Sequence, residues 1–492
     1  MDPKIKQQGY GFATYPNVKL MGYKINPKTN KQTFGFHKEL LFGDYIKPLL
    51  SNGEYMEVKV GKQSYIRVRA RNKTGYIQPS EIQANRVLEV NFIDVAQGDG
   101  CHIGTPDDKH YIIDAGKGDN MFRFLSWRFN LRYAKSSPPK FTAIISHSDA
   151  DHYGGFTKLF TQLKNSKNQF QFDTIYHNGM VEESGTPIGS LGTIVEDNNR
   201  KYVTNLCDTD SDFKKRSDST TKAGNYMKLL RKTAAQKKSL RYGNQPIYNK
   251  EGMKIEVLGP VAKKISNADA LPVFESNKGK TKNGHSVILK LTIGKLRLLL
   301  GGDLNSAAED YLLRCFTGSD IEKLTARIND PNLNEVEKKD VQAEIDRAIH
   351  QARAYFEVDI AKSCHHGSPD FTNDFLNVIH PIATIISSGD EEPYCHPRPD
   401  TLGTIGKFSR GYRSLIFSTE LARSGKEFID LSKLPAGKRK ERVVTVYGMI
   451  NVRTDGEKAI IAQKLEKPAS RKNWDIHRLE WNSNQKEFEY IR

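Results

Sequence analysis

The stretch 147–155, HSDADHYGG, constrains how this chain can fold more than any other, because it offers four metal-capable side chains within six residues. It follows the branched apolar run 141–146 (FTAIIS), which is typical of a buried strand. The two closing glycines let the backbone turn sharply. We therefore expect a metal site for an ion such as Zn²⁺ or Mn²⁺ at a strand end. The alternative is a solvated acidic loop.

Composition and charge narrow the class of protein. A chain of 492 residues predicts two or three domains. The 75 Lys and Arg exceed the 58 Asp and Glu by 17, an excess that attracts polyanions, nucleic acid first. Five scattered Cys argue against a disulfide framework and favour the reducing cytoplasm. No apolar window predicts a membrane span, and the N-terminus lacks a signal-peptide core.

The first segment, residues 1–86, has the pattern of a small antiparallel β domain. Apolar residues alternate at 55–60, 65–69 and 74–77, with turn residues between them. Residues 70–77 together with Ile82 resemble the closing strands of bacterial SH3-like barrels. That resemblance implies a module that docks a protein partner. The alternative is a β subdomain that packs on the core.

From residue 87 the pattern becomes that of a layered α/β domain. A helix is expected after Gly155, because Phe156, Phe160 and Leu163 have helical spacing. Residues 164–245 form a polar, Lys-rich insertion with a basic helix near 226–232, and 319–355 predict a helix pair broken at 330–331. The insertions are solvated helices or, for the first, a basic lid over a substrate groove. The expected strands are 87–95, 111–116, 141–146, 254–258, 286–291 and 296–300.

Three distant sites repeat the pattern of a strand followed by a metal-capable residue. Asp303 follows an apolar strand and two glycines, His365 and His366 follow 358–363, and His396 follows 385–389. Each can be a turn by itself, and the paired histidines before Gly-Ser are the most specific of the three.

In this order the motifs resemble the metallo-β-lactamase superfamily, most closely the hydrolase domain of bacterial DNA-uptake competence channels in a free-standing form. The resemblance implies a four-layer α/β/β/α sandwich over residues 87–410. With the SH3-like β-barrel expected over 1–86, the strand-like pattern that follows residue 410 predicts a β-rich extension over 411–492. The phrases that carry it are 92–99, 113–116, 146–155, 302–304, 365–368 and 394–397.

The resemblance also implies two divalent ions, Zn or Mn. One would be bound by His147, Asp149 and Asp303. The other would be bound by Asp151, His152, Asp303 and either His365 or His366. If a single ion binds, the side with Asp151, His152 and Asp303 is the one we expect.

Two departures from the family pattern bear on these ions. Asp149 stands where the commoner motif has His, and a carboxylate favours the harder Mn²⁺. The usual third-motif His is missing from the region between the strands 254–258 and 286–291, where His285 is the alternative ligand.

Further roles follow from the same resemblance. Asp94, Asp99 and Asp114 would orient ligands and loops, although Asp94 or Asp99 can instead cap turns. Asp151 and His396 are the candidate catalytic residues, with His396 as a proton or hydrogen-bond donor. A structural role for His396 beside Pro397 is the alternative. The candidate substrate-binding residues are Lys214, Lys215, Arg216 and Ser368.

The function we expect is a cytoplasmic metal-dependent phosphodiesterase, specifically a nuclease that uses a metal-bound hydroxide. One alternative is a hydrolase of a small phosphodiester or ester, such as a cyclic nucleotide, a phosphocholine ester or a lactone. The other is a metal-binding scaffold that is recruited through the N-terminal domain.

Overall fold

The computed structural model describes residues 2–129, 131, 137–161, 169–389, 394–420, 449–469 and 472–491. The chain forms two compact units of mixed α/β structure. Unit 1 comprises residues 1–91, 103–108 and 422–492, and unit 2 comprises 92–102 and 109–421. The division into 1–86, 87–410 and 411–492 stays a prediction.

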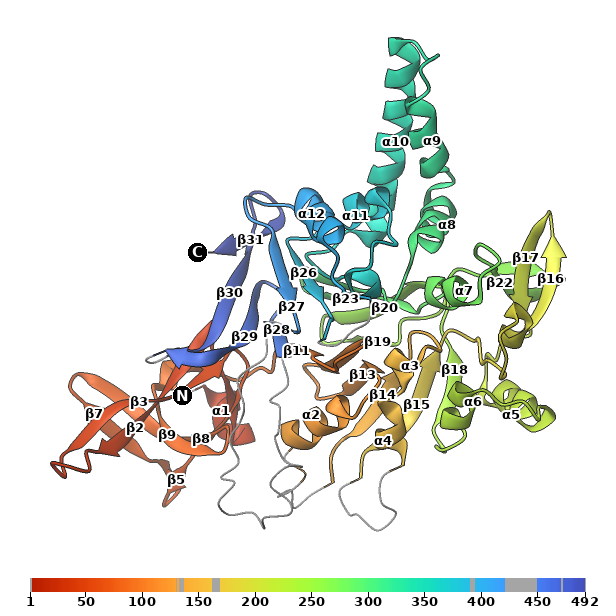
Figure 1. The fold of residues 1–492 in the computed structure, drawn as a ribbon. Helices are drawn as coiled ribbons and strands as arrows, with labels where there is room; N and C mark the ends of the chain where they lie inside the picture. The colour runs from red at the N-terminus through yellow and green to blue at the C-terminus, as the bar shows by residue number, and fades with distance from the viewer. Residues whose placement is uncertain are drawn as a thin grey trace. The chain divides into compact units, whose positions relative to one another are not determined.

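Unit 1 begins with helix α1 (Pro3–Gln8) and an eight-stranded antiparallel sheet (Figure 1). The alternating pattern expected from the sequence places Val18, Leu20, Ile66 and Val68 in its core. The sheet order is β10-β1-β4-β8-β9-β2-β3, with β7 beside β8. The likeness to an SH3-like barrel stays a prediction. The strands are β1 (Gly11–Ala13), β2 (Asn17–Ile25), β3 (Gln32–Leu41), β4 (Tyr45–Pro48), β7 (Glu57–Val60), β8 (Gln63–Ala70), β9 (Lys73–Ile77) and β10 (Ile82–Gln83).

The end of the chain completes unit 1. Four consecutive antiparallel strands run from residue 449 to 491, and Glu39 of β3 accepts hydrogen bonds from the backbone N–H groups of Asn473 (2.6 Å) and Trp474 (3.1 Å). Residues 421–448 of the β-rich extension expected over 411–492 lie outside the described residues. The four strands are β28 (Met449–Thr454), β29 (Lys458–Ala469), β30 (Lys472–Asn482) and β31 (Glu487–Ile491).

Unit 2 contains a parallel sheet in the order β18-β15-β14-β13. Its strands confirm the expectation for 111–116 and 141–146, and α4 confirms the helix expected after Gly155. The strands are β13 (His110–Ala115), β14 (Lys140–Ile144), β15 (Gln171–His177) and β18 (Gln236–Ser239), and the helices beside them are α2 (Asn120–Arg128), α3 (Ala150–Tyr153) and α4 (Phe156–Phe160). Strands β11 (Leu88–Ile93) and β12 (Gly100–Gly104) carry the chain between the units.

A second, seven-stranded sheet of unit 2 has the order β19-β20-β23-β24-β25-β26-β27. Strands β24 to β27 are parallel to one another. The strands are β19 (Tyr248–Lys250), β20 (Met253–Gly259), β23 (Ile288–Ile293), β24 (Leu296–Leu300), β25 (Ile360–Lys362), β26 (Ala383–Ile386) and β27 (Leu415–Ser418). Helices α8 (Ser306–Thr317), α11 (Asn373–Ile379) and α12 (Pro399–Phe408) belong to the same half of the unit. The four-layer arrangement stays a prediction.

The insertions in unit 2 are partly as expected. The helix pair is present as α9 (Ile321–Ile328) and α10 (Glu335–Phe356), which lie side by side (Figure 1). The basic helix is α6 (Asn225–Leu230), preceded by α5 (Asp210–Ser219). The sequence did not predict the small sheet of β16 (Thr193–Asp197), β17 (Arg200–Thr204), β22 (Ala268–Pro272) and β21 (Lys263–Ile265). Among the described residues, no helix is both long and apolar enough to cross a membrane.

Candidate metal centre

A carboxylate at the end of a neighbouring strand orients the second histidine of the 147–155 stretch. His152 lies on α3, and its Nδ1 donates to Asp114 Oδ2 of β13 at 2.8 Å. Asp114 also accepts from the backbone N–H (2.8 Å) and the hydroxyl (2.6 Å) of Ser146. The opposite ring nitrogen of His152, Nε2, therefore faces Asp303 Oδ2 at 3.1 Å. Carboxylates hold metal-binding imidazoles in this way in many proteins.

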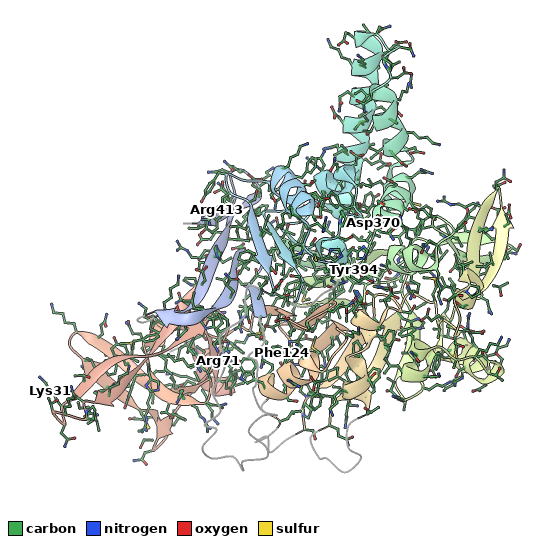
Figure 2. The ribbon with its side chains drawn as sticks, in the orientation of Figure 1. Lys31, Arg71, Phe124, Asp370, Tyr394 and Arg413 are labelled. Carbon is green, nitrogen blue, oxygen red and sulfur yellow. The ribbon has the colours of Figure 1, made fainter. Side chains whose placement is uncertain are left out.

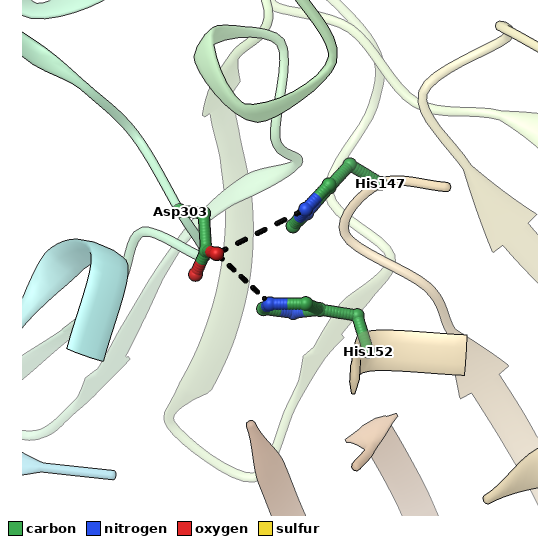
Figure 3. A group of neighbouring side chains, drawn as sticks. All are labelled: His147, His152 and Asp303. Atoms are coloured by element: carbon green, nitrogen blue, oxygen red, sulfur yellow. Dashed lines mark ion pairs between the residues drawn. The ribbon is translucent and has the colours of Figure 1, made fainter. Parts of the chain in front are cut away.

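Asp303 lies at the middle of the cluster (Figure 3). It follows β24 through Gly302, whose φ of +54° and close approach to Ser286 leave no room for a side chain. The Asp303 N–H donates to Ser286 Oγ at 3.0 Å, and the side chain is buried. Its Oδ2 lies 3.1 Å from the Nε2 of His152 and 4.0 Å from that of His147. One carboxylate thus faces both histidines of the motif.

Of the two adjacent histidines after β25, His366 reaches deeper into the cluster. Both adopt left-handed backbone conformations, with φ of 48° for His365 and 55° for His366. His366 Nε2 lies 3.2 Å from Asp303 Oδ2, and its Nδ1 lies 3.2 Å from both the Ser387 carbonyl and Asp99 Oδ1. His365 Nε2 is 4.0 Å from Asp303 Oδ2, and its side chain is 24% exposed. The geometry favours His366 as the ligand.

Four overlapping groups of side chains could each hold a metal ion, because the ligand atoms within each group lie within 4.8 Å of one another. The Nε2 atoms of His147, His152 and His366 and Oδ1 of Asp303 are buried and make no well-aligned hydrogen bond to another described residue, although the Nε2 atoms of His152 and His366 lie 3.1 and 3.2 Å from Asp303 Oδ2. Buried polar atoms are normally paired, so this donor set fits a divalent cation with nitrogen and oxygen ligands. The groups are His147–His152–Asp303, Asp151–His152–His366, Asp99–Asp114–His152 and Asp99–Asp303–His366.

The charges of the cluster balance through shifted pKa values. Burial raises the pKa of Asp303, but His152 and His366 outweigh it and hold that pKa well below its usual range. Burial lowers the pKa of His366, but Asp303 and Asp99 outweigh it and raise the pKa to about 10. Protons on the imidazoles therefore occupy the place of a cation, and binding of a metal would release them.

A lysine that the sequence analysis did not identify neutralises Asp99. The ammonium of Lys362, from β25, contacts the Asp99 carboxylate and donates to the Gly302 carbonyl at 2.9 Å. Lys362 is buried and lies 4.0 Å from Asp303 Oδ1. Its position inside a short apolar strand was a signal that could have marked it, because an unpaired lysine is rarely buried.

The outer side of the cluster is different. Asp149 Oδ2 lies 3.6 Å from His147 Nε2, but within the described ranges Asp149 belongs to none of the four groups. The ammonium of Lys282, on α7 (Lys278–Gly284), contacts Asp149 Oδ1. Burial raises the pKa of Asp149, but His147 and Lys282 together hold it well below its usual range. No pattern in the sequence indicated that Lys282 would lie beside Asp149.

His285 does not complete the outer side. Its Nε2 lies 2.7 Å from the Pro272 carbonyl, and its ring stacks on Phe274 with centroids 4.7 Å apart. Burial lowers the pKa of His285 to about 4, so the ring is neutral. It is a structural histidine within the core of unit 2.

The remaining candidate residues lie around the cluster or away from it. Gln97 Nε2 donates to Asp151 Oδ2 at 3.3 Å, and Asp94 Oδ1 accepts from the Ala96 N–H at 3.0 Å. Ser368 Oγ accepts from the Asp370 N–H at 3.2 Å, and Asp370, which Figure 2 labels, in turn accepts from Ser306 Oγ at 2.6 Å. Ser368 thus shapes the loop that carries His366.

The two remaining sets of candidates are farther from Asp303. The His396 ring is centred 6.0 Å from that of His365 and is stacked with Tyr394. Lys214, Lys215 and Arg216 lie on α5, away from the cluster. Lys214 pairs with Asp210 at 2.7 Å, and Arg216 donates to the Asn205 carbonyl at 3.0 Å. Their substrate-binding role stays a prediction.

The chain was compared with known families, curated proteins and solved structures. No family model matches the chain, and no curated protein matches it. Among solved structures, the chain is similar to a metal-dependent hydrolase of the β-lactamase superfamily. The identity is 12% and the TM-score is 0.29, and the alignment covers 67% of this chain and 95% of that one. Similarity at this level does not establish a family for the chain.

Proposed function

We propose that this protein is a metal-dependent hydrolase with a centre of metallo-β-lactamase type, and that it cleaves phosphodiester bonds in nucleic acid. The observation that supports this best is the buried cluster around Asp303, in which three imidazole Nε2 atoms converge without hydrogen-bond partners among the described residues. A cluster with a purely structural role would be expected to pair these atoms within the protein.

The residues that would hold a divalent ion are Asp303, His152 and His366, with Asp151 or His147 beside them. An ion there would act as a Lewis acid and would make water nucleophilic at neutral pH. The protein fixes the donors in advance: Asp114 holds the ring of His152, and the Ser387 carbonyl holds that of His366. Mixed nitrogen and carboxylate donors suit Zn²⁺ or Mn²⁺.

His396 is the candidate proton donor. It is partly exposed, and its ring lies beside that of His365, so it borders the cluster without being part of it. From there it would protonate the oxygen of the leaving group, which needs a group that exchanges protons near neutral pH. His396→Gln should lower kcat more than it lowers metal affinity.

The charge of the chain supports nucleic acid as the substrate. An excess of 17 positive charges attracts a polyanion such as nucleic acid. Added salt weakens this attraction, because the release of counterions from the polyanion then contributes less free energy to binding. Lys214 and Lys215 are exposed on α5 and can contact phosphates. Cleavage of polynucleotides should therefore fall steeply with salt, whereas cleavage of a small diester should not.

The test is a substrate panel with protein that has been stripped and reloaded with Mn²⁺ or Zn²⁺. Plasmid, single-stranded DNA, RNA, a cyclic dinucleotide and bis-p-nitrophenyl phosphate would be compared, with and without EDTA. We expect polynucleotide cleavage that EDTA abolishes, and a loss on the order of 1,000-fold or more in Asp303→Asn. The matched control is Asp330→Asn, at an exposed loop carboxylate, which should remain fully active.

Two results would contradict the proposal. Metal-loaded protein that cleaves nothing in the panel would remove the hydrolase assignment. Cleavage confined to the cyclic dinucleotide or the nitrophenyl diester would remove the nuclease assignment and favour a hydrolase of small diesters.

A further inference from the structure

Lys282 is clamped between two carboxylates at the outer side of the metal centre. Its ammonium contacts Asp149 Oδ1 and lies 3.7 Å from Glu182 Oε2. Glu182 is held in turn by Lys278 at 3.3 Å, from the same helix α7. The Lys282 side chain is only 13% exposed, so solvent screens its charge weakly. A fixed positive charge therefore stands beside the first carboxylate of the 147–155 stretch.

The two sides of the centre differ in how their carboxylates are matched. On the inner side, Asp303 faces the imidazoles of His152 and His366, whose Nε2 atoms have no other hydrogen-bond partner among the described residues. On the outer side, the Asp149 charge is already matched by the lysine. Within the described ranges, Asp149 is in none of the groups whose ligand atoms lie close enough to share an ion. A divalent ion placed between His147 and Asp149 would also meet the repulsion of the nearby ammonium.

We propose that the Lys282 ammonium takes the place of a second metal ion, so that the centre holds one divalent ion, bound around Asp303 and His152. Asp149 is then the partner of Lys282 and not a metal ligand. The inference rests on the proposed metal centre and deepens it.

The proposal predicts metal stoichiometry, which can be measured without activity. Protein stripped with EDTA and reloaded with Mn²⁺ would be analysed by elemental analysis, calorimetric titration and the Mn²⁺ paramagnetic resonance spectrum. The wild type should hold one ion and give the spectrum of an isolated Mn²⁺. Asp149→Asn should also hold one ion.

Replacement of the lysine should open the outer side. Lys282→Met should admit a second, weaker ion and show the spectrum of a coupled pair, because Asp149 is released from the ammonium and can bind an ion beside His147. The double variant Lys282→Met/Asp149→Asn should return to one ion. Lys280→Met is the matched control: this lysine of α7 pairs with Glu275 at 2.7 Å instead, so the count should stay at one. Circular dichroism would check that each variant is folded.

The outcomes separate this inference from the proposed function. Two ions in the wild type, loss of an ion in Asp149→Asn, or a single ion in folded Lys282→Met would each overturn the role of Lys282, while the metal centre would stand. Absence of any bound ion in the wild type would overturn the metal centre itself.

Discussion

Each unit buries a carboxylate, and the two are matched in different ways. In unit 1, Asp44 accepts from Arg71 Nη2 at 2.6 Å and Nε at 2.9 Å, from Arg453 at 2.8 Å, and from the Leu41 N–H at 3.0 Å (Figure 2 labels Arg71). In unit 2, Asp303 faces imidazoles, and its Oδ1 has no hydrogen-bond partner in the described part of the chain. Both carboxyls have pKa values below the usual range.

The two carboxylates differ in whether their positively charged partner can lose its proton. A guanidinium stays protonated at all relevant pH values, so the cluster around Asp44 is complete as the chain folds. An imidazole can give up its proton, so the cluster around Asp303 can exchange protons for a metal ion. A buried carboxylate that is fully matched by arginines indicates structure, whereas one matched by histidines with unpaired atoms indicates a binding site.

A third carboxyl group, that of Glu309, has no ion-pair partner among the described residues. Glu309 of α8 is buried and accepts from the Thr372 N–H at 2.6 Å. Burial raises its pKa to about 8, because neither the Thr372 hydrogen bond nor any neighbouring cation offsets the loss of solvent. Glu309 is therefore held as a neutral acid near pH 7.

The largest effect on stability is expected from breaking the arginine cluster. Arg453→Met leaves Asp44 buried with one guanidinium, which should lower the free energy of unfolding of unit 1 by about 3 kcal/mol. Urea denaturation in a Trp127→Phe background measures this, since Trp474 and Trp481 then report on unit 1 alone. Lys472→Met, which removes an exposed pair with Asp475, should cost less than about 1 kcal/mol. Equal losses in the two variants would refute the structural role of Asp44.

A slightly smaller effect on stability is expected when Mn²⁺ is added to bind around Asp303 in unit 2. Mn²⁺ at 100 times its Kd should stabilise the wild type by about 2.7 kcal/mol. His152→Ala removes a donor shared by three of the four groups and should lose this gain. Calorimetric unfolding with and without Mn²⁺ measures it, and the Arg453→Met variant should keep the gain. Equal stabilisation of His152→Ala and the wild type by Mn²⁺ would contradict binding of the ion by His152.

Glu309 adds a pH dependence of stability, which per single pH unit is the smallest of the three effects and accumulates over several units. Its folded pKa of about 8 exceeds the ordinary value of 4.5, so the stability that its protonated form provides is complete below pH 4.5 and is lost as the pH rises to 8. Relative to Glu309→Gln, the wild type should lose up to about 1.4 kcal/mol per pH unit between pH 5 and 8. Urea denaturation at pH 5, 6.5 and 8 measures this. The exposed control Glu196→Gln should show no such trend, and a constant difference for Glu309→Gln would exclude the raised pKa.

The sequence predicted which side chains come together around Asp303, because each of them follows a strand. Parallel strands bring their carboxyl ends to one edge, so residues after β24 and β25 meet there although some 60 positions separate Asp303 from His366. The choice between His365 and His366 needed the structure, since the left-handed backbone at both positions decides which ring turns inward.

The outer side and the pairing of unit 1 could not be predicted. Nothing local distinguishes Lys282 from the other lysines of 278–282, because its role depends on where α7 directs it. The pairing of Asp44 with Arg453 joins positions 409 residues apart, and no period or motif encodes it. The β16–β17 hairpin was not predicted, because its strands contain so many polar residues that apolar and polar positions do not alternate clearly.

That separation of 409 residues also sets an order of events during synthesis. At roughly 5–20 residues per second, Arg453 is made about 20–80 seconds after Asp44. All of unit 2 is translated in that interval, so the side chains around Asp303 can come together while the strands of unit 1 still lack their last partners. Asp44 thus reaches its final environment only after unit 2 has been made, and until then its carboxylate lacks one of its two guanidinium partners.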